Sequence, residues 1–85
     1  MEVQFLYFAW VREKTGLGEE RLELPANIET VSDLIDWQKQ RTPQYGEAFA
    51  DPQKIRVALD QQHATEESLI AGAKEIAFFP PVTGG

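Results

Sequence analysis

Two short apolar segments at opposite ends of the chain constrain its fold more than any other feature of the sequence. Residues 2–8 (EVQFLYF) alternate as a strand would, with apolar side chains on nearly both faces, and residues 75–79 (EIAFF) are again dense in apolar side chains. Strands of this kind escape water only in the middle of a sheet. We therefore expect the two ends of the chain to lie side by side as central strands.

The segment between these ends predicts one main helix and three more strands. Residues 31–41 are expected to form the helix, because apolar side chains recur there at helical spacing. Thr30 followed by Asp33 resembles a capping box at its start. Alternation of apolar and polar side chains predicts the remaining strands, at residues 20–24, 54–59 and 62–64.

Turn-forming residues in the rest of the chain predict turns and a loop. A short helical turn is expected at 9–15, and Asp60-Gln61 predicts a tight turn between two strands. Residues 42–53 carry two prolines and a glycine, which predicts a loop pinned to the core by Tyr45 and Phe49.

The order of elements is β, β, α, β, β, β, with the two apolar strands at the ends. One amphipathic helix can cover one face of a mixed sheet whose centre is formed by those two strands. This predicts an α+β fold of the β-grasp, or ubiquitin-like, type, with a right-handed crossover through the main helix. A chain of 85 residues has room for one domain, which we place at residues 1–79, followed by a C-terminal tail at 80–85.

The composition limits the chemistry that the chain can perform. It has no cysteine, which excludes disulfides, cysteine-ligated metal sites and a thiol nucleophile of its own. Its net charge of -6 argues against binding to nucleic acid or to anionic membranes. The negative charge either steers the chain onto a basic partner or serves solubility alone. No secretion signal or membrane-spanning run is evident, so we expect a cytoplasmic protein.

The last six residues, Pro80-Pro81-Val82-Thr83-Gly84-Gly85, suggest where chemistry takes place. Two prolines cannot continue a sheet ladder and favour an extended path away from the body of the domain. Two glycines fit a narrow channel and leave the terminal carboxylate open to attack. A carboxylate is inert at neutral pH and has to be activated, for example as an acyl-adenylate. We expect no cofactor on this chain, and we expect the activating partner to use ATP.

The run Ala77-Phe78-Phe79-Pro80-Pro81-Val82-Thr83-Gly84-Gly85 resembles the carboxyl terminus of the MoaD family, the small sulfur-carrier subunit of molybdopterin synthase. Phe8-Ala9 and Val11-Arg12-Glu13 also look like the first strand and turn of that family. The turn at Asp60-Gln61 commonly reads Asn-Gln in the family, and a bulky apolar residue stands near the position of His63.

The resemblance implies a carrier and not an autonomous enzyme. An E1-like adenylyltransferase of the MoeB type would adenylate Gly85, and a sulfur donor protein would supply the sulfur for a thiocarboxylate. The tail residues Pro81, Val82, Thr83 and Gly84 would thread into a MoaE-like large subunit, which holds the active site. There the sulfur would pass to a cyclic pyranopterin precursor of molybdopterin, within a heterotetramer of two small and two large subunits.

Four side chains outside the tail are candidates for the partner interface: Phe79, Arg12, Phe8 and His63. Phe79 is either an interface anchor or a core residue, whereas Phe78 points the opposite way and is expected in the core. Arg12 either forms an ion pair or is a solvated surface residue. His63 is interpreted as a surface or rim residue, since no second ligand stands at metal spacing and no metal site is expected.

Two other classes of function fit the same sequence. A sulfur carrier for thiamine synthesis or tRNA thiolation would share the fold and the terminal Gly84-Gly85, although the Phe-Phe-Pro-Pro-Val-Thr approach resembles the molybdopterin branch more closely. A β-grasp interaction module that carries no sulfur is the other alternative. It predicts that removal of Gly84 and Gly85 leaves activity intact.

Overall fold

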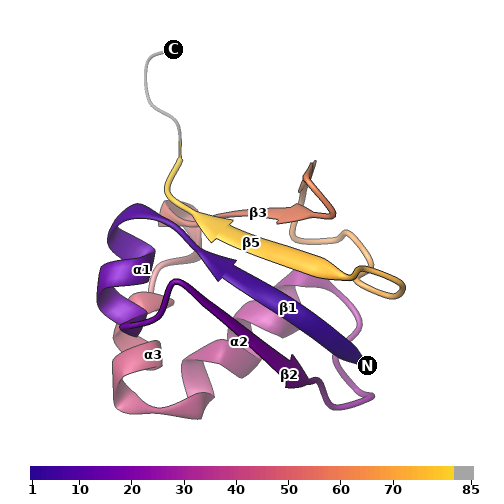
Figure 1. Cartoon of the computed structure of the whole chain (residues 1–85), viewed down its shortest axis with the longest axis horizontal. Helices are drawn as coiled ribbons and strands as arrows, with labels where there is room; N and C mark the ends of the chain where they lie inside the picture. The colour runs from indigo at the N-terminus through magenta and orange to yellow at the C-terminus, as the bar shows by residue number, and fades with distance from the viewer. Residues whose placement is uncertain (82–85) are drawn as a thin grey trace.

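The computed structural model describes residues 1–81, and residues 82–85 of the predicted tail lie outside that range. Its five strands form one mixed sheet in the order β2-β1-β5-β3-β4, in which β1 and β5 are parallel and the other pairs are antiparallel. The two terminal strands therefore lie next to each other in the middle of the sheet, which confirms the predicted β-grasp fold (Figure 1). The elements are β1 (Glu2–Tyr7), α1 (Ala9–Thr15), β2 (Glu19–Glu23), α2 (Val31–Arg41), α3 (Pro43–Ala48), the 3-10 helix η1 (Pro52–Lys54), β3 (Arg56–Leu59), β4 (Gln62–Ala64) and β5 (Glu75–Phe79).

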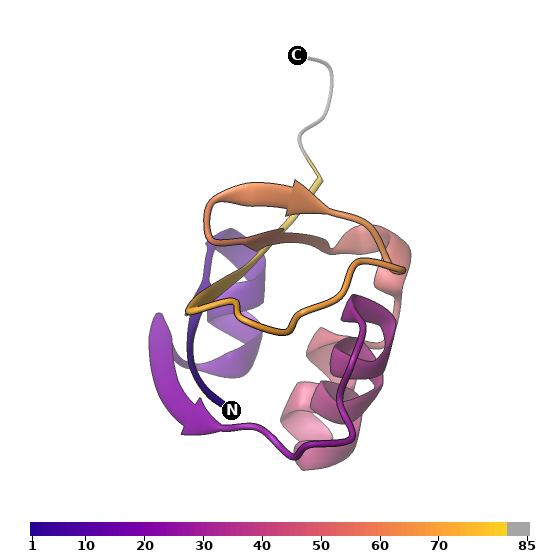
Figure 2. The same cartoon turned by 90° about the vertical axis from the view of Figure 1, so that its right-hand side faces the viewer.

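The core lies between the sheet and the helices. In Figure 2, α2 and α3 lie on the right and β1 and β2 on the left, with the core between them. Phe5 of β1 and Phe78 of β5 are fully buried, and their rings meet edge to face with centroids 5.1 Å apart. Phe78 also meets Phe49, from the chain after α3, at 5.2 Å. The prediction that Phe78 belongs to the core is confirmed.

The main helix α2 spans the predicted residues and begins with the predicted capping box. The Thr30 hydroxyl accepts from the Asp33 backbone N–H at 3.1 Å, and an Asp33 carboxylate oxygen accepts from the Thr30 N–H at 3.2 Å. These two bonds satisfy N–H groups that the first turn of a helix cannot pair internally.

The prediction of a loop over residues 42–53 is wrong in part. Pro43 opens the helix α3 there, and η1 follows. The Thr42 hydroxyl caps α3 by accepting from the Tyr45 N–H at 3.1 Å, and Pro43 fits the first helical position because it needs no N–H there. The expected anchoring is nevertheless confirmed, since Tyr45 and Phe49 are both buried.

The tight turn at Asp60 and Gln61 is confirmed, with positive φ angles of 50° and 71° at these two residues. Turns of this kind match the twist of the hairpin that β3 and β4 form. One Asp60 carboxylate oxygen also accepts from the backbone N–H groups of Lys74 and Glu75, each at 3.0 Å. The turn is thereby attached to the start of β5.

Candidate functional site

The site begins where the chain leaves the sheet. We call Phe79, Pro80 and Pro81 the tail root, because they join the end of β5 to the predicted tail. All three are half-buried, and β5 ends next to the end of β1, where the Phe8 N–H donates to the Phe78 carbonyl at 3.1 Å. Val82, Thr83, Gly84 and Gly85 lie outside the described residues, so their predicted roles stay predictions.

One face of the sheet, which we call the open face, is left without a helix. The residues of the central strands that face the core contact α2, α3 and one another, whereas the alternate residues point the other way. Leu6, Ala77 and Ala58 form a row across β1, β5 and β3 in consecutive register. The two alanines are only 9% and 8% exposed although no helix covers them, because larger neighbours surround their small side chains.

Two aromatic side chains lie next to this row, each two residues further along its strand and close to the tail root. Phe8 continues the outward alternation of β1 and is 48% exposed, which is unusual for so large an apolar side chain. Phe79 is half-buried, and its ring meets the ring of His63 edge to face with centroids 5.4 Å apart. His63 is exposed and pairs with Ala58 in the register of β3 and β4.

The structure thus places three of the four predicted interface residues on one apolar face, next to the point where the chain exits. Clustered exposed aromatic side chains are typical of protein interfaces. His63 is a surface residue, in agreement with its interpretation from the sequence. Whether Phe8, Phe79 and His63 contact a partner stays a prediction.

The fourth predicted interface residue, Arg12, lies on α1. Its side chain is exposed and rests against Gly18, where an added Cβ would come within 3.2 Å of the Arg12 Nε atom. Gly18 lies next to β1, since its carbonyl accepts from the Tyr7 N–H at 2.9 Å. Among residues 1–81, Arg12 has no acidic group within ion-pair distance.

A second cluster of polar side chains lies on the core side of the sheet, and sequence analysis did not identify it. Tyr7 and Tyr45 donate to the Glu20 carboxylate at 2.8 and 3.2 Å, and Arg41 donates to both of its oxygens at 2.6 and 3.1 Å. Gln38 donates to the Tyr7 hydroxyl at 2.9 Å and accepts from Arg41 at 2.8 Å. Every buried side-chain nitrogen or oxygen of residues 1–81 has a hydrogen-bond partner.

The electrostatics of this cluster indicate a structural role. Burial raises the pKa of Tyr7 far above its ordinary value and keeps the hydroxyl protonated. Burial alone would raise the pKa of Glu20, but hydrogen bonds from Arg41, Tyr7 and Tyr45 outweigh burial and lower that pKa. Glu20 is therefore a paired carboxylate. Both oxygens of Glu20 accept hydrogen bonds, and its lowered pKa keeps it charged.

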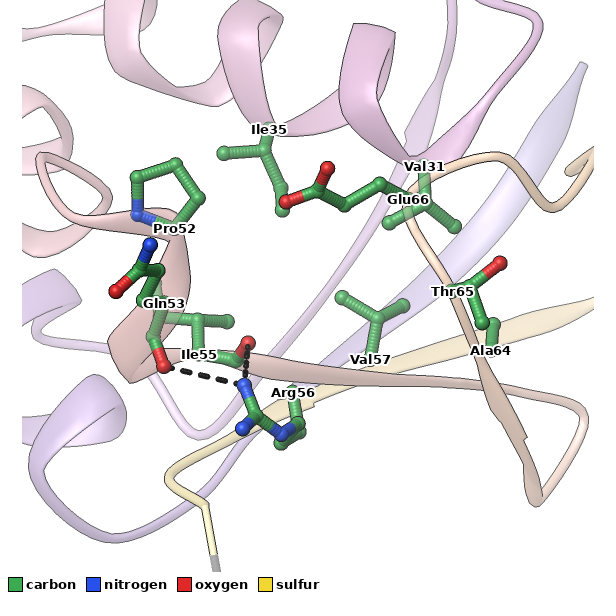
Figure 3. Close-up of a pocket in the computed structure, with 10 residues that line it drawn as sticks. All are labelled: Val31, Ile35, Pro52, Gln53, Ile55, Arg56, Val57, Ala64, Thr65 and Glu66. Carbon is green, nitrogen blue, oxygen red and sulfur yellow. Dashed lines mark hydrogen bonds between the residues drawn. The ribbon is translucent and has the colours of Figure 1, made fainter.

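A groove of about 480 Å³ lies between α2, η1 and the β3–β4 hairpin (Figure 3). Apolar side chains of α2 and β3, including Ile35 and Val57, point into the groove, and the Glu66 side chain extends across it. Thr65 and Glu66 both line this groove, and the side-chain contact of the Thr65 hydroxyl is with the Ser68 hydroxyl. Residues 1–81 also contain no group of three His, Cys, Asp or Glu side chains that could hold a metal ion, and no helix long and apolar enough to cross a bilayer.

Fold and site together define a ubiquitin-like β-grasp protein with an open apolar face at its C-terminal exit. The chain belongs to the ThiS family, whose model matches residues 5–85. It is 32% identical over 83 residues to the molybdopterin synthase sulfur carrier subunit of Escherichia coli, which covers 98% of this chain and 99% of that protein. The protein of the same name from Haemophilus influenzae is 34% identical over 80 residues, 94% of this chain and 95% of its own length.

Two solved structures have the same fold. The protein described as molybdopterin converting factor, subunit 1, from Pyrococcus furiosus has a TM-score of 0.70 at 25% identity, over 96% of this chain and 99% of that one. SAMP1 from Haloferax volcanii has a TM-score of 0.71 over the full length of both chains, and at 24% identity it shows that the fold is shared. The resemblance to the MoaD family is confirmed, and the chain is a MoaD/ThiS-like β-grasp protein.

Proposed function

We propose that this chain is the sulfur carrier subunit of a molybdopterin synthase. The observation that carries the proposal is the place of the tail root. It continues directly from the open face, so that a partner that covers Phe8 and Phe79 also receives residues 82–85. The full-length relatives named molybdopterin synthase sulfur carrier subunit support the same conclusion.

The chemistry takes place at the carboxylate of Gly85. An E1-like adenylyltransferase of the MoeB type binds ATP and joins the Gly85 carboxylate to AMP, with release of pyrophosphate. Sulfur at the oxidation level of sulfide, delivered by a sulfur donor protein, then attacks the acyl carbon. The bond from that carbon to AMP breaks as the carbon–sulfur bond forms, which leaves a thiocarboxylate. The chain itself binds no cofactor in this scheme.

A MoaE-like large subunit then accepts the tail, and its active site transfers the sulfur to a cyclic pyranopterin precursor. Pro81, Val82, Thr83 and Gly84 thread through its channel, while Phe79, Phe8, His63 and Arg12 form the contact outside it. A dithiolene contains two sulfur atoms, so each product requires two loaded carriers. We place this activity in the cytoplasm, in a heterotetramer with two large subunits.

Addition of one alanine after Gly85 tests the proposal. The extended tail places the wrong residue at the acyl-transfer centre, so we expect conversion of the precursor by the reconstituted synthase to be lost. A Lys74→Gln chain, altered at an exposed residue remote from the tail root, is the control and is expected to retain full conversion. Full conversion by the extended chain would refute a terminal sulfur carrier.

The alternative is a sulfur carrier for thiamine synthesis or tRNA thiolation. The identity of the partner protein distinguishes that alternative from this proposal. Isolation of the chain from its native host is expected to recover a MoaE-like subunit. Recovery of a thiazole synthase in its place would move the chain to the thiamine branch. A β-grasp module without carrier function would keep its activity when Gly84 and Gly85 are removed.

A further inference from the structure

We propose that a pocket beside Leu69 is a docking site for a segment of a partner protein that combines apolar side chains with lysine or arginine. The pocket lies at the end of the sheet opposite to the tail root. The inference goes beyond the proposed function and does not depend on it.

The backbone around Leu69 is fixed, and it holds the Leu69 side chain in solvent. The Ile70 N–H donates to the Glu29 carbonyl at 3.0 Å. The Ser68 carbonyl accepts from the Val31 N–H, also at 3.0 Å. Ile70 points into the core and is 1% exposed, and neighbouring residues of an extended segment point to opposite sides. Leu69 is therefore turned outward and is 68% exposed.

A pocket of about 260 Å³, which we call the Leu69 pocket, adjoins this side chain. Glu29 is the charged side chain of its lining. The rest of the lining is mainly apolar and includes Met1, Leu24, Pro25, Ile28, Leu69 and Ala71. Sites for small molecules usually have about 300–1,000 Å³, so this pocket suits an anchoring side chain of a larger partner better than a free cofactor. An exposed apolar side chain beside an apolar pocket is typical of an interaction site.

The Leu69 pocket is separate from the surface that the proposed function uses. The strands β1 and β5 run parallel, so the residues before them lie at the end of the sheet opposite to the tail root (Figure 1). Met1 precedes β1, and Leu69 precedes β5. Phe8 and Phe79 lie at the other end of the same two strands. The pocket can therefore be occupied while another protein holds the tail root.

Acidic side chains are concentrated around the Leu69 pocket. Three segments meet there through backbone hydrogen bonds, at residues 1–2, 23–33 and 66–75. They contain seven of the fourteen Asp and Glu residues of the chain, but one of its eight Lys and Arg residues. Acidic and basic residues are equal in number in the rest of the chain. The negative charge of the protein is thus located mainly at this end.

Part of this negative charge is neutralised within the chain. Arg21 pairs with Glu2, and the N-terminal amine pairs with Glu23. Glu29 and Glu67 have no lysine or arginine within ion-pair distance among residues 1–81. These two carboxylates are placed to meet basic side chains of a partner.

The charge also decides which occupant fits the pocket. A second copy of this chain would bring two acidic ends together, and repulsion also opposes nucleic acid and anionic membranes. A purely apolar ligand would leave the carboxylates unused. An amphipathic segment that inserts an apolar side chain beside Leu69 and places lysine or arginine near Glu29 and Glu67 matches both features of the site.

The test uses a synthetic amphipathic peptide with leucines on one helical face and lysines on the other. It is titrated into the isotope-labelled full chain, and NMR spectroscopy is expected to show shift changes at the backbone amides around Leu69 and Ile28. Leu69→Ser is expected to weaken binding about tenfold, because a leucine that becomes buried on binding contributes at about that level. Leu17→Ser makes the same change at an exposed leucine after α1, and should weaken binding less than about twofold.

A second pair of variants tests the charge. Glu29→Gln is expected to weaken binding of the peptide about threefold, and added salt should reduce this difference. Glu13→Gln, which changes the net charge equally at an exposed residue of α1, should leave binding nearly unchanged. A peptide with glutamates in place of the lysines is expected not to bind.

Three results would each overturn the inference: no saturable binding of the leucine–lysine peptide, equal weakening by Leu69→Ser and Leu17→Ser, or shift changes centred on Phe8 and Phe79. Equal binding of the glutamate peptide would refute the choice of a basic partner. Thermal unfolding checks that each variant is folded. Glu29→Gln still tests the site if Leu69→Ser proves unstable, because no other side chain of residues 1–81 pairs with the Glu29 carboxylate.

Discussion

The two faces of the central sheet are built from alternate residues of the same strands, yet they differ in almost every physical respect. The core face is closed, since Phe5 and Phe78 are fully buried and the polar groups around Glu20 satisfy one another. The open face has no helix, exposes Phe8 and ends at the tail root. We therefore expect stability to depend mainly on the core face and less on the open face.

The adjacent residues Phe78 and Phe79 give the sharpest test of this division. Phe78→Ala removes a fully buried ring in contact with Phe5 and Phe49, and is expected to lower the free energy of unfolding by about 3–5 kcal/mol. A domain of this size has a total of roughly 4–13 kcal/mol, so the variant should be largely or partly unfolded. Urea denaturation followed by circular dichroism measures the change. A loss below about 1 kcal/mol would contradict the division between the faces.

Phe79→Ala is expected to leave the stability nearly unchanged and to weaken partner binding. Its half-buried ring contributes about 1 kcal/mol or less to folding, while its loss should weaken binding to the large subunit by about 30-fold, as anchors at interface centres do. Calorimetric titration of the folded variant measures the affinity. Unchanged affinity together with a large loss of stability would show that Phe79 serves the core and not the interface.

Glu20→Gln tests the polar cluster on the core face. The charge that Arg41 and two tyrosines stabilise is lost, and we expect a decrease of about 2 kcal/mol in unfolding free energy at neutral pH. The matched control, Glu19→Gln, alters an exposed neighbour and should cost less than about 0.5 kcal/mol.

The stability difference between wild type and Glu20→Gln is expected to depend on pH. The pKa of Glu20 is lowered in the folded chain, so its contribution is fully present above the unfolded pKa of about 4.3 and is lost as the pH falls through the folded value. The difference between wild type and Glu20→Gln should therefore shrink below about pH 4, as chemical denaturation at a series of pH values can determine. A difference that grows at acid pH would refute the lowered pKa.

Asp60 lies in the turn between β3 and β4, and the smallest effect is expected there. Asp60→Ala removes the acceptor of two backbone N–H groups and places alanine at a positive φ, with an expected cost of about 1–2 kcal/mol. Asp60→Asn keeps an acceptor oxygen and tolerates that φ, so it should remain within about 0.5 kcal/mol of wild type in thermal unfolding. Equal losses in both variants would show that the negative charge, and not the turn geometry, matters.

The fold was predictable wherever a short stretch of sequence carries its own signal. The apolar terminal strands, the capping box at Thr30 and the turn at Asp60 are local patterns, and each is found in the structure. The helix α3 was missed because Pro43 was interpreted as a breaker. The same proline, preceded by Thr42 as a cap, is also a normal helix start, and only packing decides between the two.

The candidate site was predictable only in part, for a related reason. Phe8 and Phe79 were identified from a resemblance near the two ends of the chain, and the sheet brings them together. Glu20 was missed because its partner Arg41 lies 21 positions away in the sequence. Contacts between distant elements depend on register, which local patterns do not specify.

The central claim is that the Gly85 carboxylate receives sulfur, and intact-mass spectrometry tests it most directly. The chain is incubated with its adenylyltransferase, ATP and sulfide and is then weighed. The account predicts a species heavier by the difference between one sulfur and one oxygen atom, with the replaced atom mapped to the last residue by fragmentation. An unchanged mass, under conditions in which the same enzyme loads another carrier, would contradict the account.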